Sequence, residues 1–186
     1  VVERNNVVNV EAFTELMNVM ASGIGSPCNP NKIANTFKSV KKETVAPHTI
    51  ANYLSYMEDA FIIEKSMRYD IKGRKYIGTL SKYYFQDVGL RNALLNFRQV
   101  EETHIMENVI YNELRSRGYS VDVGIVEART ALERKLLEVD FVANKGDKRY
   151  YIQSAFALPD EEKRQQEMAS LKRIDDSFKK IIIVRE

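Results

Sequence analysis

The sequence predicts a mixed α+β protein built in two parts, and two patterns indicate this class. In residues 1–81, apolar side chains recur at helical spacing in three short segments, and a basic strand–turn–strand segment follows. In residues 82–186, helical and strand patterns come in the order α-β-β-β-α-β, which predicts a small mixed sheet with helices packed on it. We therefore expect an N-terminal domain over residues 1–81, with a linker at its start, and a C-terminal domain over residues 82–186.

The first part has the layout of a winged helix-turn-helix domain. Its helices are expected over residues 11–25, 29–39 and 47–60, where apolar positions repeat with helical period. The hairpin is expected over residues 61–80, with Lys72-Gly73 in the turn. Three short helices followed by a basic hairpin is the order that defines this fold.

The second part opens with a short helix, which Asp87 is expected to cap. Further helices are predicted for residues 103–118 and 158–176, and strands for residues 119–126, 136–143, 150–157 and 179–186. The last strand is a short apolar run, and such runs are typical of strands that are buried.

Composition excludes several classes of protein. The chain is 44% hydrophobic and 29% charged, which suits a soluble globular protein and argues against disorder. A single cysteine, Cys28, permits neither an internal disulfide nor a cysteine-rich zinc site. With no signal peptide and no apolar run long enough for a membrane helix, we expect a cytoplasmic protein without membrane contact. The chain begins with Val1 rather than Met, as a fragment of a longer protein would.

Positive charge is local rather than global. The net charge is only +2, so contact with nucleic acid requires a patch of cations. From Lys65 to Lys75 there are five cations and one acid, a local net charge of +4. Such cations bind phosphates with little sequence information, whereas Asn on the third helix can read adenine and Ser or Thr there can contact base or backbone. The predicted nucleic-acid-binding residues are Lys41, Lys42, His48, Asn52, Lys65, Arg68, Lys72, Arg74 and Lys75. A role of this part in protein docking fits the same pattern.

The strands of the second part have the outline of a metal-dependent nuclease core. Such a core carries an Asp on one strand and Glu-x-Lys on the next, because carboxylates hold Mg²⁺ and the ammonium group acts on water. Strand alternation predicts that Val139 and Phe141 share one face and that Asp140 points to the other, with Glu138. On the next strand, the positions for Glu and Lys are occupied by Gln153 and Ala155. The amide of Gln153 is a neutral and weaker metal ligand than a carboxylate, and Ala155 has no ammonium group. Tyr151, Gln153 and Ala155 are expected on one face of that strand, opposite Tyr150 and Ile152.

The helix over residues 103–118 offers a further carboxylate. Glu107 lies at the edge of its apolar arc and is expected to reach the sheet, whereas Glu113 falls inside the arc, where it needs a partner or a raised pKa. Three interpretations stay open for Glu107, Asp140 and Gln153. In the first, they form hydrogen bonds or ion pairs with backbone or Arg groups at the sheet edge. In the second, they bind a metal or an anion without cleaving a substrate. In the third, they form the metal site of an active nuclease.

Several segments resemble the C-terminal region of a large family of bacterial and archaeal AAA-type ATPases. They are TIANYLSYMEDAFIIEKSMRYDIKGRKYI, KYYFQDVGLRNALL, ENVIYNELRSRGY, EVDFVA and YYIQSAFALPDEEKRQQEMASL, and with VVERNN they cover nearly the whole chain. The resemblance implies a P-loop ATPase domain upstream, followed by a winged helix and a restriction-endonuclease-like, PD-(D/E)XK domain. It matches Glu107 and Asp140 to the first two nuclease-type acids and Gln153 to a position that is often Gln in that family.

No phosphate-binding loop is present in this chain, because none of its glycines is followed by Lys. We therefore expect no cofactor in this fragment, and ATP and Mg²⁺ only in an upstream domain. The predicted function is non-catalytic recognition or assembly for such an ATPase, through DNA, a partner protein or self-association. The alternatives are a metal-dependent nuclease that uses Glu107 and Asp140, and a winged-helix DNA-binding regulator.

Overall fold

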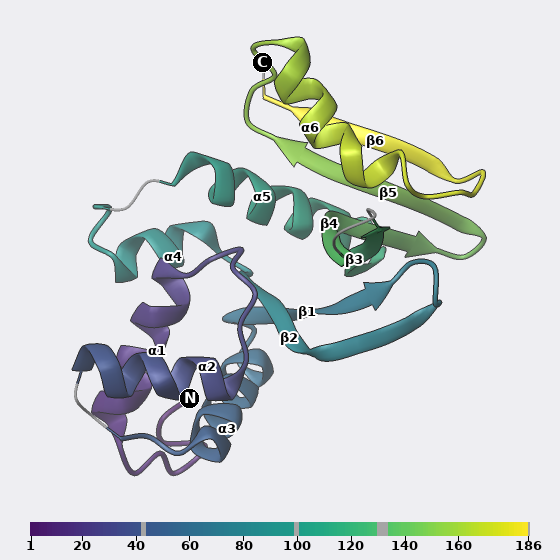
Figure 1. Ribbon diagram of the computed structural model, residues 1–186. Helices are drawn as coiled ribbons and strands as arrows, with labels where there is room; N and C mark the ends of the chain where they lie inside the picture. Colours follow the sequence, from purple (N-terminus) through teal and green to yellow (C-terminus); the bar gives the residue numbers. More distant parts are fainter. Residues whose placement is uncertain (42–43, 99–100, 130–133, 186) are drawn as a thin grey trace. The chain divides into compact units, whose positions relative to one another are not determined.

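The structure is a computed structural model that describes residues 1–41, 44–98, 101–129 and 134–185. The chain forms two compact units (Figure 1). The first unit contains Val1–Lys65 and Thr79–Glu101, and the second contains Ser66–Gly78 and Glu102–Glu186. Among the described residues, no helix has the length and apolar character required to cross a membrane.

Helices form the first unit, and their predicted positions are confirmed. They are α1 (Val10–Ser22), α2 (Pro30–Thr36), the π-helix η1 (Phe37–Lys41), α3 (Pro47–Asp59) and α4 (Val88–Leu94). Side-chain oxygens of Asn9, Asn29 and Asp87 accept hydrogen bonds from backbone N–H groups in the first turns of α1, α2 and α4. These caps satisfy amide groups that have no partner within the helix.

The guanidinium of Arg91 is buried in the first unit, beside its apolar core. Apolar side chains of α1, α2 and α3 pack together, with the rings of Phe13 and Tyr53 in edge-to-face contact at 5.3 Å. Arg91 of α4 is fully buried, and its Nε donates a hydrogen bond of 2.9 Å to the carbonyl oxygen of Ala21 in α1. Burial lowers the pKa of Arg91. The bond to Ala21 uses a carbonyl at the end of α1 and holds α4 against that helix.

The strands form a single mixed sheet. They are β1 (Ile63–Asp70), β2 (Lys75–Phe85), β3 (Ser120–Arg129), β4 (Arg134–Lys145), β5 (Lys148–Ala155) and β6 (Lys179–Val184). The six strands follow the order β2-β1-β3-β4-β5-β6. The β1–β3 and β5–β6 pairs are parallel, whereas β4 is antiparallel to both of its neighbours. The mixed α+β class is thereby confirmed.

In the second unit, one helix covers each face of the sheet (Figure 1). The helix α6 (Glu161–Leu171) packs on the face where Val142 and Tyr151 are buried with Leu171. The helix α5 (Glu102–Ser116) packs on the opposite face, where Tyr111 lies against Phe141 with ring centroids 6.4 Å apart. The predicted order α-β-β-β-α-β is confirmed.

The β1–β2 hairpin differs most from the sequence expectation. The prediction placed the whole hairpin in the first domain, as the wing of a winged helix, with a boundary after residue 81. In the structure, β1 pairs with β3 through Arg68↔Val123, and Ser66–Gly78 belongs to the second unit. Tyr69 and Ile71 pack with the core beneath α6, and burial of their apolar surface stabilises the tip of the hairpin in the sheet.

A β-bulge in β4 overturns one predicted facing. Asp122 pairs with Val142 but Gly124 pairs with Val139, so the register shifts by one residue around Asp140. Val139 therefore lies in the core beneath α6, while Phe141 contacts α5. The prediction that these two side chains share a face was wrong because simple alternation does not include a bulge.

One further expectation was wrong. The strand β6 is half-buried and forms one edge of the sheet, rather than being a buried strand. On α5, the buried face carries Glu107 and Tyr111, while Glu113 is exposed. Glu113 has a partner, as its position in the apolar arc was expected to require, because its carboxylate lies 2.5 Å from the guanidinium of Arg117. Together with Val109, which is 51% exposed, it lines an open groove.

Gly124 permits the close packing at the bulge, and its substitution is our first prediction. A Cβ at this position would lie 2.8 Å from Val142 Cγ2, 2.9 Å from Ile71 Cδ1 and 2.9 Å from Val139 Cβ. We expect Gly124→Val to lower the free energy of unfolding by about 1–3 kcal/mol because the core is overpacked. Urea denaturation measures this loss.

The control for this prediction is Ser120→Val, which adds the same side chain at an exposed position of the same strand. We expect this variant to be as stable as the wild type. Equal stability of Gly124→Val and Ser120→Val would contradict the packing described around Gly124.

Candidate functional site

Asp140, one of the two predicted nuclease-type acids, accepts a hydrogen bond from the backbone. It is 8% exposed, and its Oδ2 accepts a hydrogen bond of 2.7 Å from the N–H of Ser154. The described β4–β5 pairing ends at Phe141↔Ile152, one step before this contact. The carboxylate thus occupies the place of a strand partner for a buried amide, which is a structural use for an acid beside a bulge.

The other predicted acids lie on α5 and β4. Glu107 is buried on α5 and Glu138 is half-buried on β4, and both interact with neighbouring groups. In the described ranges, no three His, Cys, Asp or Glu side chains form a group suited to a metal ion. Gln153 faces α6, where its Oε1 accepts a hydrogen bond of 3.5 Å from Ser170. The predicted facing of β5 is confirmed at Tyr151 and Gln153, which lie beneath α6.

The predicted nucleic-acid-binding residues are distributed over both units. In the first unit, His48 and Asn52 are exposed on α3, and Lys65 is exposed near the start of β1. Lys42 lies outside the described residues, as does the side chain of Lys41.

In the second unit, Lys72, Arg74 and Lys75 are exposed at the end of the hairpin. Arg68 is half-buried, and its Nε has no hydrogen-bond partner among the described residues. The three exposed side chains are therefore better placed than Arg68 for contact with a phosphate.

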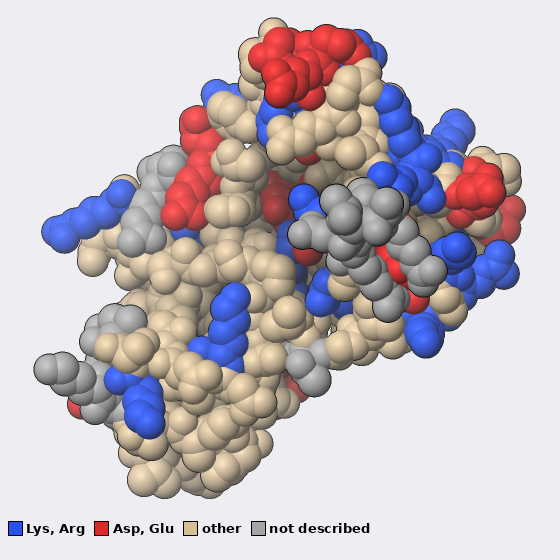
Figure 2. Space-filling view, in the orientation of Figure 1, with Lys and Arg blue, Asp and Glu red and all other residues tan. Residues whose placement is uncertain are grey.

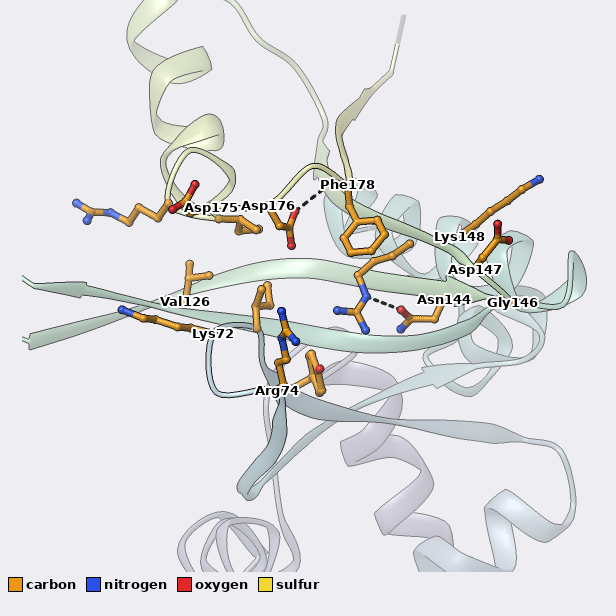
Figure 3. Close-up of a pocket in the computed structure, with 15 residues that line it drawn as sticks. Lys72, Arg74, Val126, Asn144, Gly146, Asp147, Lys148, Asp175, Asp176 and Phe178 are labelled. Carbon is orange, nitrogen blue, oxygen red and sulfur yellow. Dashed lines mark hydrogen bonds between the residues drawn. The ribbon is translucent and has the colours of Figure 1, made fainter.

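A polar cavity in the second unit brings hairpin cations together with cations from later in the chain (Figure 3). Its volume is about 620 Å³. It is lined by the hairpin, by the β4–β5 turn and by the segment between α6 and β6. The charged lining residues are Lys72, Arg74, Lys148, Arg149 and Arg173, with Asp147, Asp175 and Asp176.

Arg149 is fixed in the wall of this cavity. Its guanidinium carbon lies 5.6 Å from the centroid of the Tyr69 ring and 5.5 Å from that of Phe178. Its Nε donates a hydrogen bond of 2.6 Å to Oδ1 of Asn144. Burial alone would lower the pKa of Arg149, but interactions with Tyr151 and Tyr69 raise it. The side chain is thus a permanent, oriented cation.

A second set of hydrogen bonds fixes the segment that follows α6. The hydroxyl of Tyr151 donates to Oδ2 of Asp176 at 2.6 Å, and the N–H of Phe178 donates to Oδ1 of Asp176 at 3.1 Å. Burial and the bond to Asp176 raise the pKa of Tyr151 to about 12. Burial alone would raise the pKa of Asp176, but the bonds from Tyr151, Phe178 and Lys180 outweigh it and lower that pKa.

The hairpin turn presents Arg74 to the cavity. Oδ1 of Asp70 accepts a hydrogen bond of 2.9 Å from the N–H of Gly73. A Cβ on Gly73 would lie 2.3 Å from Oδ2 of Asp70, so a larger residue here would displace the Asp70 carboxylate. Arg74 adopts a positive φ of 51°. Figure 3 shows Arg74 pointing into the cavity, with Lys72 and Lys148 extending toward solvent at its two ends.

The distribution of charge distinguishes the two units on the visible face. In Figure 2, Lys and Arg side chains lie among Asp and Glu over the second unit, whereas the first unit shows mainly uncharged side chains. Sequence reasoning identified Lys72 and Arg74 but missed Lys148, Arg149 and Arg173. Alternation along β5 places Arg149 on the same face as Tyr151, which was the available signal. No pattern in the sequence near the hairpin indicated that it would pack against β3 and the core beneath α6.

Comparisons with known proteins give a family and a relative. Residues 1–101 match the family described as "Domain of unknown function (DUF8612)". A protein of Haemophilus influenzae described as "Uncharacterized protein" is 35% identical over 183 residues, which is 98% of this chain. The chain spans 43% of the length of that relative. No solved structure matches the chain.

The match to the family ends at residue 101, where the first compact unit also ends, and it covers more than half of the chain. The chain therefore belongs to the DUF8612 family.

Proposed function

We propose that this chain is a non-catalytic recognition or assembly module for an AAA-type ATPase domain located upstream of it. Two observations support the proposal. The Haemophilus influenzae relative is longer than this chain, which spans 43% of it, so the relative has room for a further domain. The order of three helices and a hairpin is that of a winged helix, and the elements from α5 to β6 suit a PD-(D/E)XK-like unit.

The observation that carries the non-catalytic reading is the contact between Asp140 and Ser154. A metal ligand needs its carboxylate oxygens directed to an open site, whereas Asp140 is buried and accepts a backbone hydrogen bond. Ala155 is buried at the position where the nuclease pattern has Lys. The hydrogen bond from Ser154 gives Asp140 a structural role that does not depend on cleavage of nucleic acid.

Our second prediction separates this structural role from catalysis. Asp140→Ala leaves the buried N–H of Ser154 without its acceptor, and we expect a loss of about 1–3 kcal/mol in unfolding free energy. Asp140→Asn keeps an acceptor oxygen and is expected to lose less. Asp147→Ala, which removes an exposed acid of the same unit, is the control and is expected to change little. Chemical denaturation measures all three.

The same variants test the nuclease alternative. We expect plasmid and single-stranded DNA to remain intact with the wild-type chain in Mg²⁺ or Mn²⁺. Metal-dependent cleavage that Asp140→Asn abolishes, in a variant that circular dichroism shows to be folded, would overturn the non-catalytic proposal. Loss of stability without any cleavage is the result that the Asp140–Ser154 contact predicts.

The recognised partner that we propose is nucleic acid. Lys72 and Arg74 are exposed at the hairpin, and no described residue forms an ion pair or hydrogen bond with their side chains. Cations that are free in this way bind phosphates through the release of counterions. The alternative contact surface is α3, where His48 and Asn52 are exposed.

Our third prediction compares these surfaces by fluorescence anisotropy with labelled single-stranded and duplex DNA over a range of salt. We expect Lys72→Ala/Arg74→Ala to weaken binding of the preferred form. The salt slope is expected to fall by about 2, because two phosphate contacts are lost. Lys38→Ala/Arg164→Ala removes the same charge at exposed positions elsewhere and is expected to keep the wild-type slope.

The outcomes separate the interpretations. Absence of binding to both DNA forms at low salt refutes nucleic acid as the partner and leaves protein docking. Binding that is lost in His48→Ala/Asn52→Ala but retained in the hairpin variant favours a winged-helix DNA-binding regulator.

A further inference from the structure

The cavity beside Arg149 has a mixed composition that a simple phosphate site does not require. Its lining combines cations with the carboxylates of Asp147, Asp175 and Asp176, and its floor includes the apolar side chains of Val126 and Ile174. A phosphate held beside Asp176, which Figure 3 shows pointing inward, would be repelled by that carboxylate. Lys72 and Lys148 at the ends of the cavity suit anionic groups of a ligand. The interior, which is polar and partly apolar, suits an uncharged group of the same ligand.

A nucleotide has this division of chemistry. Its phosphates are anionic, and its base is a flat ring that, in adenine, cytosine and guanine, carries an amino group from which a carboxylate accepts a hydrogen bond. The volume of about 620 Å³ lies in the range of pockets that take a small molecule, and it admits one unstacked nucleotide. Lys72 and Lys148 at opposite ends of the cavity suit the phosphates on either side of that base (Figure 3).

An exposed aromatic ring borders the same cavity. Phe178 is 39% exposed, although one side of its ring contacts the Arg149 guanidinium. Proteins that bind single strands combine a cationic groove with aromatic rings on which bases stack. In a duplex the bases are already stacked and paired, so none is available to enter a hollow of this kind without being extruded.

We propose that this cavity binds single-stranded nucleic acid by accepting one unstacked base against Phe178, with the flanking phosphates on Lys72, Arg74 and Lys148. The proposal rests on the nucleic-acid role proposed above and names the form of nucleic acid and the site. The wall residues Arg149 and Asp176 are fixed before binding, Arg149 by Asn144 and Asp176 by the buried Tyr151, which reduces the ordering cost of association.

The test is fluorescence anisotropy with a labelled 20-nucleotide single strand and the corresponding duplex. We expect the wild type to prefer the single strand. Phe178→Ala is expected to weaken single-strand binding about tenfold, because one stacked base is worth roughly 1–3 kcal/mol, while duplex affinity and the salt slope stay unchanged. Phe178→Leu keeps apolar bulk without an aromatic ring, and it should recover less than half of the lost binding energy if stacking is responsible.

Controls guard against indirect effects. Phe61→Ala removes a ring that is 78% exposed in the first unit and should leave both affinities unchanged. Thermal melting establishes that the Phe178 variants are folded. A strand carrying 2-aminopurine reports base contact directly, and we expect its fluorescence to change with the wild type and much less with Phe178→Ala.

Three results would overturn the cavity proposal. They are preference of the wild type for duplex, equal weakening of both DNA forms by Phe178→Ala, and full affinity of a folded Phe178→Ala variant for the single strand. If duplex binding persists in those cases, the nucleic-acid role stands and only the cavity is refuted. If neither form binds at low salt, both proposals fail.

Discussion

The parallel pairing of β1 with β3 determines where the charged groups of this molecule lie. Among the described residues, three pairs define it, from Arg68↔Val123 to Asp70↔Ile125, and it places the end of the β1–β2 hairpin in the second unit. Burial of Tyr69 and Ile71 beneath α6 stabilises this position. Gly124 is needed at the same place, since any side chain there would meet Ile71 and the bulged strand. Without this pairing, Arg74 and Arg149 would not line one cavity.

The bulge in β4 is the second constraint, and it explains why acids on this strand need not be catalytic. The extra residue of a bulge is itself left unpaired and disrupts the ladder locally, and the described β4–β5 pairing ends beside it, at Phe141↔Ile152. Asp140 provides the acceptor for the N–H of Ser154. An acceptor oxygen in a buried position is less costly when it receives such a hydrogen bond. Selection for the fold alone is therefore sufficient to keep an Asp at this position, and its presence carries little information about metal binding.

Local signals in the sequence were enough to predict the elements but not their assembly. Helical spacing and the caps at Asn9, Asn29 and Asp87 are properties of neighbouring residues, and the helices formed where they indicated. The pairing of β1 with β3 joins segments more than 50 residues apart and has no local signature. The bulge at Asp140 has none either, because it depends on the register with Asp122 and Gly124. The cavity therefore could not be predicted, although Lys72 and Arg74 were among the predicted nucleic-acid-binding residues.

Charged groups in the cavity wall and at its rim have different physical roles. In the wall, Arg149 is held by Asn144 and two aromatic rings, and Asp176 is held by Tyr151 and Phe178. The lowered pKa of Asp176 means that its contribution to stability is complete above the unfolded-state pKa and is lost only as pH falls through the folded-state pKa. The raised pKa of Tyr151 keeps its hydroxyl protonated at neutral pH, so it remains a donor. The wall is therefore constant around neutrality, and affinity for an anionic ligand should vary there with salt, through the exposed rim cations, more than with pH.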